Sequence, residues 1–174
     1  MNTGARVVII GADTARARAY AESLERASLG PVEGLFYGSP MPEREQRKNE
    51  GTTIGSLWIP RLGTSVVEIF KRNRWPFKWL ATDGINSSQA VDALRDSGAE
   101  LAIFAGKGGE IVSSNALAQG VPLLHMHPET MIEVVRHLRQ HGQLPSAQPS
   151  AESAGRLYYV VHPLLKHLAL LSLK

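Results

Sequence analysis

Short apolar runs alternate with segments of helical period along most of this chain, and that alternation restricts the fold more than any other feature. The first unit is RVVIIGA, a β-branched run that ends in glycine, followed by TARARAYAESLERA, in which apolar residues recur among charges. Such units predict an α/β fold with a doubly wound, mainly parallel sheet that helices cover on both faces. The predicted strands are residues 6–11, 32–37, 77–81, 101–105 and 121–126, and the predicted helices are residues 14–27, 65–73, 88–98, 113–120 and 127–142.

Three segments divide the 174 residues. Residues 1–142 form the predicted α/β domain, in which residues 39–55 read as a polar loop. Residues 143–155 have the Pro, Ser and Ala content of a linker. The tail, residues 156–174, is apolar again, with a short strand expected before Pro163 and leucines at helical spacing after it. We expect the tail to pack on its own sheet or to join a second copy in a homodimer, with disorder as the remaining alternative.

Composition excludes several kinds of function. The chain has no cysteine, so disulfides, thiolate catalysis and cysteine-bound zinc are excluded. Its net charge of +3 is spread thinly with little aromatic interleaving, so we expect no nucleic acid partner. The apolar run near Met1 is too short for a secretory signal, and no run approaches the roughly 18 residues of a membrane span. We therefore expect a cytoplasmic protein with no membrane contact.

Polar or glycine-rich residues follow three of the predicted strands. TDGINSS occupies residues 82–88, GKGGE occupies residues 106–110, and the last strand ends in LLHMH. Open parallel sheets bind ligands outside the carboxyl ends of their strands, so a site is expected where these three segments meet. The alternative is that the glycines only turn the chain.

The HMH sequence places two imidazoles one residue apart at a strand end. Alternate residues of a strand share a face, so His125 and His127 are expected to point the same way, opposite to Leu124 and Met126. We predict that both imidazoles lie in a cleft bordered by the two preceding polar loops. In the alternative arrangement, backbone groups satisfy both rings.

Two other kinds of site fit the sequence less well. Only Gly11 matches the G-x-G-x-x-G motif of dinucleotide sites, and Asp13 would place a carboxylate beside a pyrophosphate. GKGGE is an alternative anion nest, with Lys107 beside it. A zinc site would need His125 and His127 to converge with His137 and His141, but a helix from about residue 129 would carry His137 more than ~10 Å away. We therefore predict no metal site and expect His137 and His141 on a solvated helix face.

The span ELAIFAGKGGEIVSSNALAQGVPLLHMHPE, residues 100–129, resembles the core of the folate-dependent formyltransferases. This family includes glycinamide ribonucleotide, methionyl-tRNA and sugar N-formyltransferases. Its members have a strand, a small glycine-containing loop, a helix, and a second strand that ends in a catalytic histidine. Here GKGGEIV occupies the loop, His127-Pro128 fits the histidine motif, and TDGINSSQAVDAL is similar to the segment before it. The likeness covers about residues 6–129, and residues 100–129 are its specific part.

The resemblance implies a Rossmann-like sheet and a one-carbon transferase that moves a formyl group from 10-formyltetrahydrofolate to a small-molecule amine. In that chemistry an oxyanion forms and a proton must reach the departing folate nitrogen, so a donor and an acid/base group must face one point. The resemblance assigns the proton transfer to His127, and His125 stands where most of the family has asparagine. It implies that the folate pterin is bound by Asn86, Gly106, Lys107, Gly108, Gly109, Glu110, Ile111 and Val112.

The chain departs from the family after residue 129. Helical sequence follows directly where the family has a loop, and no aspartate exists beyond Asp96 to orient His127, so Glu129, Glu110 or Asp83 would have to replace it. Two hypotheses follow: an active, minimal formyltransferase, or a catalytically degenerate relative that serves as a binding or regulatory module. A carboxylate near His127 distinguishes them. An unrelated α/β domain is the third possibility.

Overall fold

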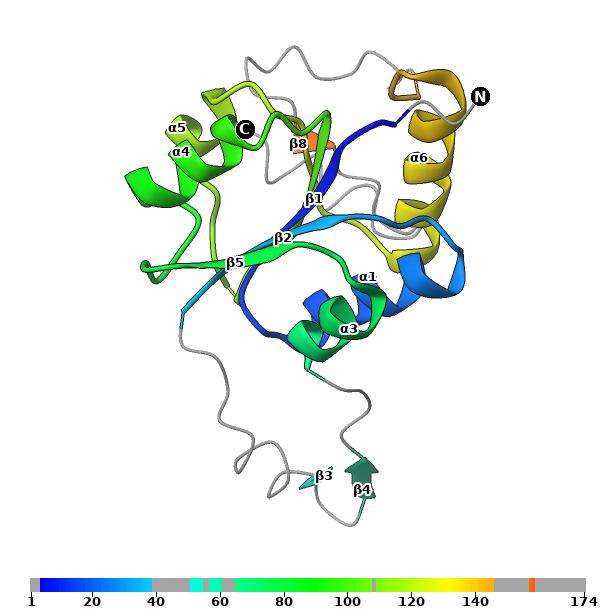
Figure 1. Ribbon diagram of the computed structural model, residues 1–174. Helices are drawn as coiled ribbons and strands as arrows, with labels where there is room; N and C mark the ends of the chain where they lie inside the picture. The colour runs from blue at the N-terminus through cyan, green and yellow to red at the C-terminus, as the bar shows by residue number, and fades with distance from the viewer. Residues whose placement is uncertain are drawn as a thin grey trace, which may run out of the picture.

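The computed structural model describes residues 4–38, 51–54, 57–60, 65–107, 109–145 and 157–158. Five strands form the main parallel sheet, in the order β5 (Phe77–Leu80), β2 (Glu33–Tyr37), β1 (Val7–Gly11), β6 (Leu101–Ala105) and β7 (Leu123–Leu124) (Figure 1). The two-residue β8 (Leu157–Tyr158) pairs in parallel with β7 at one edge. The predicted parallel sheet is confirmed.

The order of the strands reverses next to β1. From β1 the chain adds β2 and then β5 on one side, and afterwards β6, β7 and β8 on the other. The crevice at such a reversal, between the carboxyl ends of β1 and β6, is the usual ligand position in doubly wound sheets.

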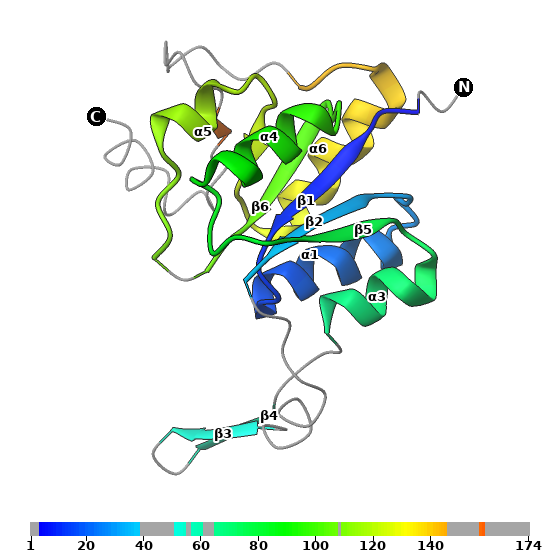
Figure 2. The same ribbon diagram turned by 60° about the vertical axis from the view of Figure 1, so that its left-hand side comes forward.

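Helices cover both faces of this sheet, as the alternation predicts (Figures 1 and 2). One face carries α1 (Ala15–Arg26), α3 (Val66–Asn73) and α6 (Pro128–His141), and the other carries α4 (Ser88–Asp96) and α5 (Ser114–Ala118). Successive residues of β1 face opposite ways, so Val7 and Ile9 join the first core, and Val8 and Ile10 join the second. A strand that is buried on both faces must be apolar throughout, which explains the run VVII.

Local sequence sets where the helices begin. Thr14, Ser65, Ser87 and Ser113 each precede a helix and accept a hydrogen bond from a backbone N–H of its first turn. These side chains satisfy N–H groups that lack a partner within the helix. These four helices, α1, α3, α4 and α5, therefore each start at a hydroxyl residue.

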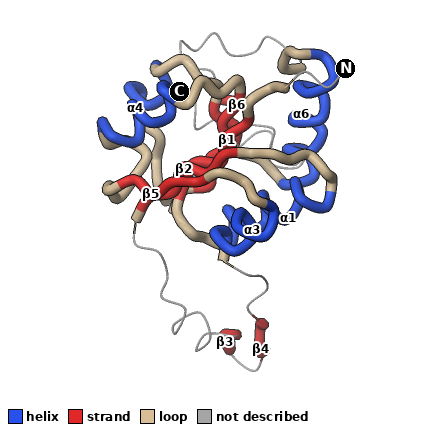
Figure 3. The backbone as a smooth tube through the Cα atoms, viewed as in Figure 1, coloured by secondary structure: helices blue, strands red, loops and turns tan. Residues whose placement is uncertain are grey.

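The predicted polar loop over residues 39–55 is wrong at its carboxyl end. Residues Gly51–Ile54 form β3, which pairs antiparallel with β4 (Leu57–Pro60) in a separate two-stranded sheet (Figure 3). Two four-residue runs rich in β-branched and apolar residues, separated by Gly-Ser, are a hairpin signal. The polar residues before β3 hide this signal, and residues 39–50 lie outside the described part of the chain.

The last predicted strand is shorter than expected, because only Leu123 and Leu124 pair with β6. Pro122 has no N–H to donate, and the chain leaves the sheet at His125 to begin α6. In the tail, the strand was expected over residues 158–161, and β8 overlaps it at Tyr158. Residues 159–174, with the predicted helix after Pro163, lie outside the described residues, as does most of the predicted linker. No helix among the described residues is long and apolar enough to cross a bilayer.

Candidate functional site

The carboxylate of Glu110 ties together three segments at the carboxyl edge of the sheet. Its Oε2 accepts hydrogen bonds from the Tyr37 hydroxyl at 2.6 Å and from the Lys107 N–H at 2.9 Å, and its Oε1 accepts one from the Ile85 N–H at 2.8 Å. Tyr37 ends β2, and Ile85 follows β5. Because β2 and β1 separate β5 from β6 in the sheet, the loop after β6 reaches across the ends of two strands.

Asn86 adds a second connection between the same loops. Its side-chain amide donates to the carbonyl of Ile111 at 2.7 Å and accepts from the N–H of Ser113 at 2.7 Å. Lys107 adds a third, because its ammonium group donates to the carbonyl of Asp83 at 2.9 Å. The two polar loops predicted to border one site are therefore joined side by side.

Two glycines make room for the Glu110 carboxylate. A Cβ added at Gly84 would lie 2.8 Å from Oε1, and one added at Gly106 would lie 2.4 Å from Oε2 and 2.3 Å from the ring of Phe104. Real Cβ atoms do not approach other atoms so closely. These glycines are therefore needed for the close packing of the loops and not only for turns.

Tyr37 belongs to this site, although sequence analysis did not single it out. The side chain is fully buried, and its hydroxyl is held by Glu110. Burial raises the pKa of the Tyr37 phenol, and the hydrogen bond to the Glu110 carboxylate raises it further. The phenol therefore stays protonated and donates. The sequence did contain a signal for Tyr37, because an aromatic residue with a hydroxyl group stands at the end of an apolar strand, next to Gly38.

The rim of the joined loops carries the remaining predicted ligand residues. Ile111 is 81% exposed, whereas Val112 is half-buried and packs against the second core. Gly109 is exposed with φ of 79°, and Gly108 lies outside the described residues. An exposed isoleucine on a loop held by so many hydrogen bonds offers an apolar surface beside fixed backbone groups.

His125 lies half-buried beside β6. Its Nδ1 is 3.2 Å from the carbonyl oxygen of Phe104, and its ring centre is 5.8 Å from that of the Phe104 side chain. A carbonyl only accepts, so Nδ1 carries the proton in this contact. Burial lowers the pKa of His125, the Phe104 hydrogen bond partly opposes this, and the charge of Arg16 lowers the pKa further. At neutral pH the imidazole is therefore uncharged.

His127 lies at the start of α6 and is exposed. Its Nδ1 accepts the N–H of Glu129 at 3.4 Å, so the ring caps the helix. Met126 lies between the two histidines and is buried in the first core, so the expected alternation of Met126 with its neighbours is present. No carboxylate among the described residues hydrogen-bonds His127, and no hydrogen bond or ring contact between the two imidazoles is found in this part of the chain.

The turn after β1, where a dinucleotide motif would lie, is occupied by the chain itself. A Cβ at Gly11 would lie 2.2 Å from the carbonyl oxygen of Ala105, so β1 and β6 approach closely there. Asp13 accepts from the Ser65 hydroxyl at 2.8 Å and from the Val66 N–H at 3.2 Å, and Arg18 lies 3.8 Å away. A carboxylate therefore already fills the anion position at the start of α3.

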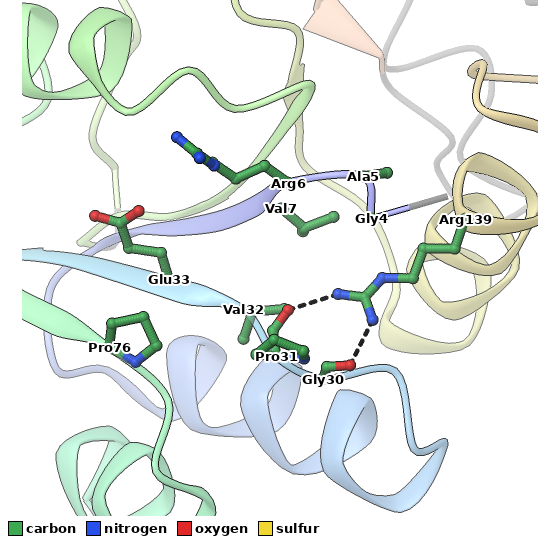
Figure 4. A pocket seen from close by; sticks show the side chains of 10 residues that line it. All are labelled: Gly4, Ala5, Arg6, Val7, Gly30, Pro31, Val32, Glu33, Pro76 and Arg139. Carbon is green, nitrogen blue, oxygen red and sulfur yellow. Dashed lines mark hydrogen bonds between the residues drawn. The ribbon is translucent and has the colours of Figure 1, made fainter. Parts of the chain in front are cut away.

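A cavity of about 480 Å³ lies at the opposite, amino edge of the sheet (Figure 4). It lies beside the starts of β1 and β2, and Arg139 reaches it from α6. The Arg139 guanidinium donates to the carbonyls of Gly30 and Pro31, each at 2.6 Å, and burial lowers its pKa. None of the predicted site residues lines this cavity.

Models of protein families do not match this chain, and the curated proteins contain no match either. The geometry described above therefore carries the functional argument alone.

Proposed function

We propose that this chain is a binding module at the carboxyl edge of its sheet, a catalytically degenerate relative of the folate-dependent formyltransferases. Its ligand is a reduced folate, held through the pterin ring by the loop of residues 106–112. The observation that carries the proposal is the joining of that loop to residues 83–86 by Glu110, Asn86 and Lys107.

Preorganisation supports ligand binding at this loop. Residues that hydrogen bonds already hold in place, such as Lys107 and Glu110, lose little conformational entropy when a ligand arrives, so more of the interaction energy appears as affinity. A pterin has an amide-like edge suited to backbone N–H and C=O groups and an apolar ring face. The exposed Ile111 side chain fits the ring face, and the backbone beside it fits the edge.

The surroundings of His127 favour binding without transfer. Acid/base catalysis needs a histidine whose ring is oriented and whose proton is exchanged with the reacting group. Here Nδ1 accepts from the Glu129 backbone, and no described carboxylate orients the ring. The distinguishing feature set out from the sequence is thus missing among the described residues, which favours the degenerate relative over the active enzyme.

Calorimetric titration of the full chain with tetrahydrofolate tests the proposal. We expect saturable binding that Ile111→Ala weakens by about tenfold, since partial burial of this side chain is worth about 1.4 kcal/mol. The side chain is exposed, so the melting temperature of the variant should equal that of the parent chain.

Two controls sharpen the titration. p-Aminobenzoylglutamate, which lacks the pterin, should not bind, and Gln119→Ala, at a half-buried residue beyond the loop, should bind tetrahydrofolate as the parent does. Absence of tetrahydrofolate binding, or equal affinity in Ile111→Ala, would refute the proposal.

An active formyltransferase is the second candidate, favoured by one observation. The Phe104 carbonyl fixes the tautomer of His125, and burial keeps that ring uncharged, as a base requires. Formylation of a small amine by 10-formyltetrahydrofolate in the presence of the full chain, lost in both His125→Ala and His127→Ala, would decide for this candidate.

A further inference from the structure

Two histidines at the end of α6 lie against each other, far along the helix from the carboxyl-edge loops. The ring centres of His137 and His141 are 4.4 Å apart, with 42° between the ring planes. Residues four apart share one face of a helix, and here both rings lie on the surface, His141 exposed and His137 half-buried. The proposed folate site uses neither ring.

This separation suits a metal ion bound by both imidazoles. Metal–nitrogen bonds to histidine are about 2.0–2.1 Å long, so two imidazoles on one ion have ring centres roughly 4.5–5 Å apart. The observed 4.4 Å therefore needs only a small side-chain rotation to reach that geometry. Paired histidines four apart on a helix are a known arrangement of zinc ligands.

The end of α6 and one acidic side chain also favour a cation at this pair. His141 is the last residue of α6, where unpaired carbonyls give the helix end a partial negative charge. Glu133 is exposed one turn before His137 on the same helix row. Of the two arginines nearby, Arg136 is exposed next to His137, and Arg139 directs its guanidinium to the carbonyls of Gly30 and Pro31.

We infer that His137 and His141 form a binding site for one divalent transition-metal ion, with water completing the coordination. No group of three ligating side chains exists among the described residues, so the protein supplies two nitrogen ligands there. The affinity of imidazole ligands for divalent ions follows a general order in which Cu²⁺ binds more tightly than Ni²⁺ or Zn²⁺. Mg²⁺ prefers oxygen ligands and does not bind at this site. The bound ion links the last two turns of α6.

Titration of the full chain with Cu²⁺ at neutral pH tests this inference. We expect one equivalent to bind with a paramagnetic resonance spectrum that shows two nitrogen ligands. Loss of a residue that only hydrogen-bonds a metal ligand typically weakens metal binding by roughly 10- to 100-fold. Loss of a ligand itself should cost at least as much, so we expect His137→Gln and His141→Gln each to weaken Cu²⁺ binding by that factor or more. Both residues are at the surface, so circular dichroism should show folded variants.

Matched variants separate this site from other imidazoles. The exposed neighbour Gln140→Ala should bind Cu²⁺ as the parent does, and so should the double variant His162→Gln, His167→Gln in the tail. Unchanged Cu²⁺ binding in both the His137 and His141 variants, or a spectrum with a single nitrogen ligand, would overturn the inference. Failure of the folate titration would not affect it, because the two sites share no residue.

Discussion

At the scale of single residues, the Glu110 carboxylate is the main cross-link of the carboxyl edge. An ionised carboxylate has four lone pairs on its two oxygens and can accept hydrogen bonds from several donors at once. The Glu110 carboxylate accepts from three donors, which come from three segments of the chain. No amide or hydroxyl of similar size has the same acceptor capacity. The arrangement therefore depends on a carboxylate at this position.

Replacement of Glu110 by glutamine should lower the free energy of unfolding by about 1–3 kcal/mol, because the new NH₂ group would face an N–H or O–H donor. Tyr37→Phe, which removes one of the three donors, should cost less. Urea denaturation measures both. Glu133→Gln on the exposed face of α6 is the control and should stay within about 0.5 kcal/mol of the parent. Equal stability of Glu110→Gln and the control would contradict the cross-link.

His125 makes the stability of the protein depend on pH, and the direction of that dependence follows from its pKa. Its pKa is lowered below the usual 6.5, chiefly by burial, so between the lowered value and 6.5 the unfolded chain binds more protons than the folded one. The contribution of His125 to stability is therefore complete above about pH 6.5 and is lost as the pH falls through the folded-state pKa.

We expect the free energy of unfolding to fall on acidification across this window, and His125→Gln to reduce that fall. Denaturation at a series of pH values measures the slope. Gln140→Ala should keep the parent's slope, because it changes an exposed side chain that carries no titratable group. A slope that His125→Gln leaves unchanged would refute the assignment.

At the scale of elements, the contact between β1 and β6 sets the geometry of the strand ends. Gly11 lies so close to Ala105 that any Cβ would overlap the backbone of the neighbouring strand. Thr14, which begins α1, also directs its hydroxyl to the Ala105 carbonyl, at 3.4 Å. The turn after β1 is thus packed directly on β6, which leaves Gly106 and its loop in a fixed position.

Gly11→Ala should destabilise the protein by about 3 kcal/mol or more, the upper range of overpacking costs, because the overlap is with backbone that cannot rotate away. Gly4→Ala is the matched control, since nothing lies within 4 Å of its added Cβ. Thermal and urea unfolding of both variants measure the difference. A Gly11→Ala protein as stable as the Gly4→Ala protein would show that the strands can separate at little cost.

At the scale of the whole molecule, the tail contributes to the sheet through β8. Leu157 and Tyr158 pair with Leu123 and Leu124, so β7 has partners on both sides. Without β8, the unpaired backbone groups of β7 would form the edge of the sheet.

Deletion of residues 156–174 should lower the melting temperature by a few degrees, since about 1 kcal/mol shifts it by roughly 2–4 °C in a chain of this size. Deletion of residues 159–174 alone, which keeps β8, separates the strand from the rest of the tail. Solution mass of the three proteins tests the homodimer, which is one of the alternatives for the tail. An unchanged melting temperature after the longer deletion would show that β8 adds nothing to stability.

Much of the fold follows from the chain's own pattern. Apolar runs such as VVII are typical of strands that are buried on both faces, as in a parallel sheet covered by helices. A hydroxyl residue marks the start of four helices, so strands and helices could be placed from sequence. The β3–β4 hairpin was missed because its Gly-Ser turn follows a long polar stretch. Runs of four residues are too short for periodicity alone to distinguish a strand from a loop.

The candidate site was also predictable from sequence only in part. The position of the polar loops at the strand ends follows from topology, and the order of loops along the chain is visible in the sequence. The contact of Glu110 with Tyr37, 73 residues apart, and the capping of α6 by His127 depend on how the loops cross the sheet. Sequence alone thus determined the alternating units and the edge at which they end. Only the tertiary structure decided which side chains meet there, because side-chain contacts between distant segments are set by three-dimensional packing.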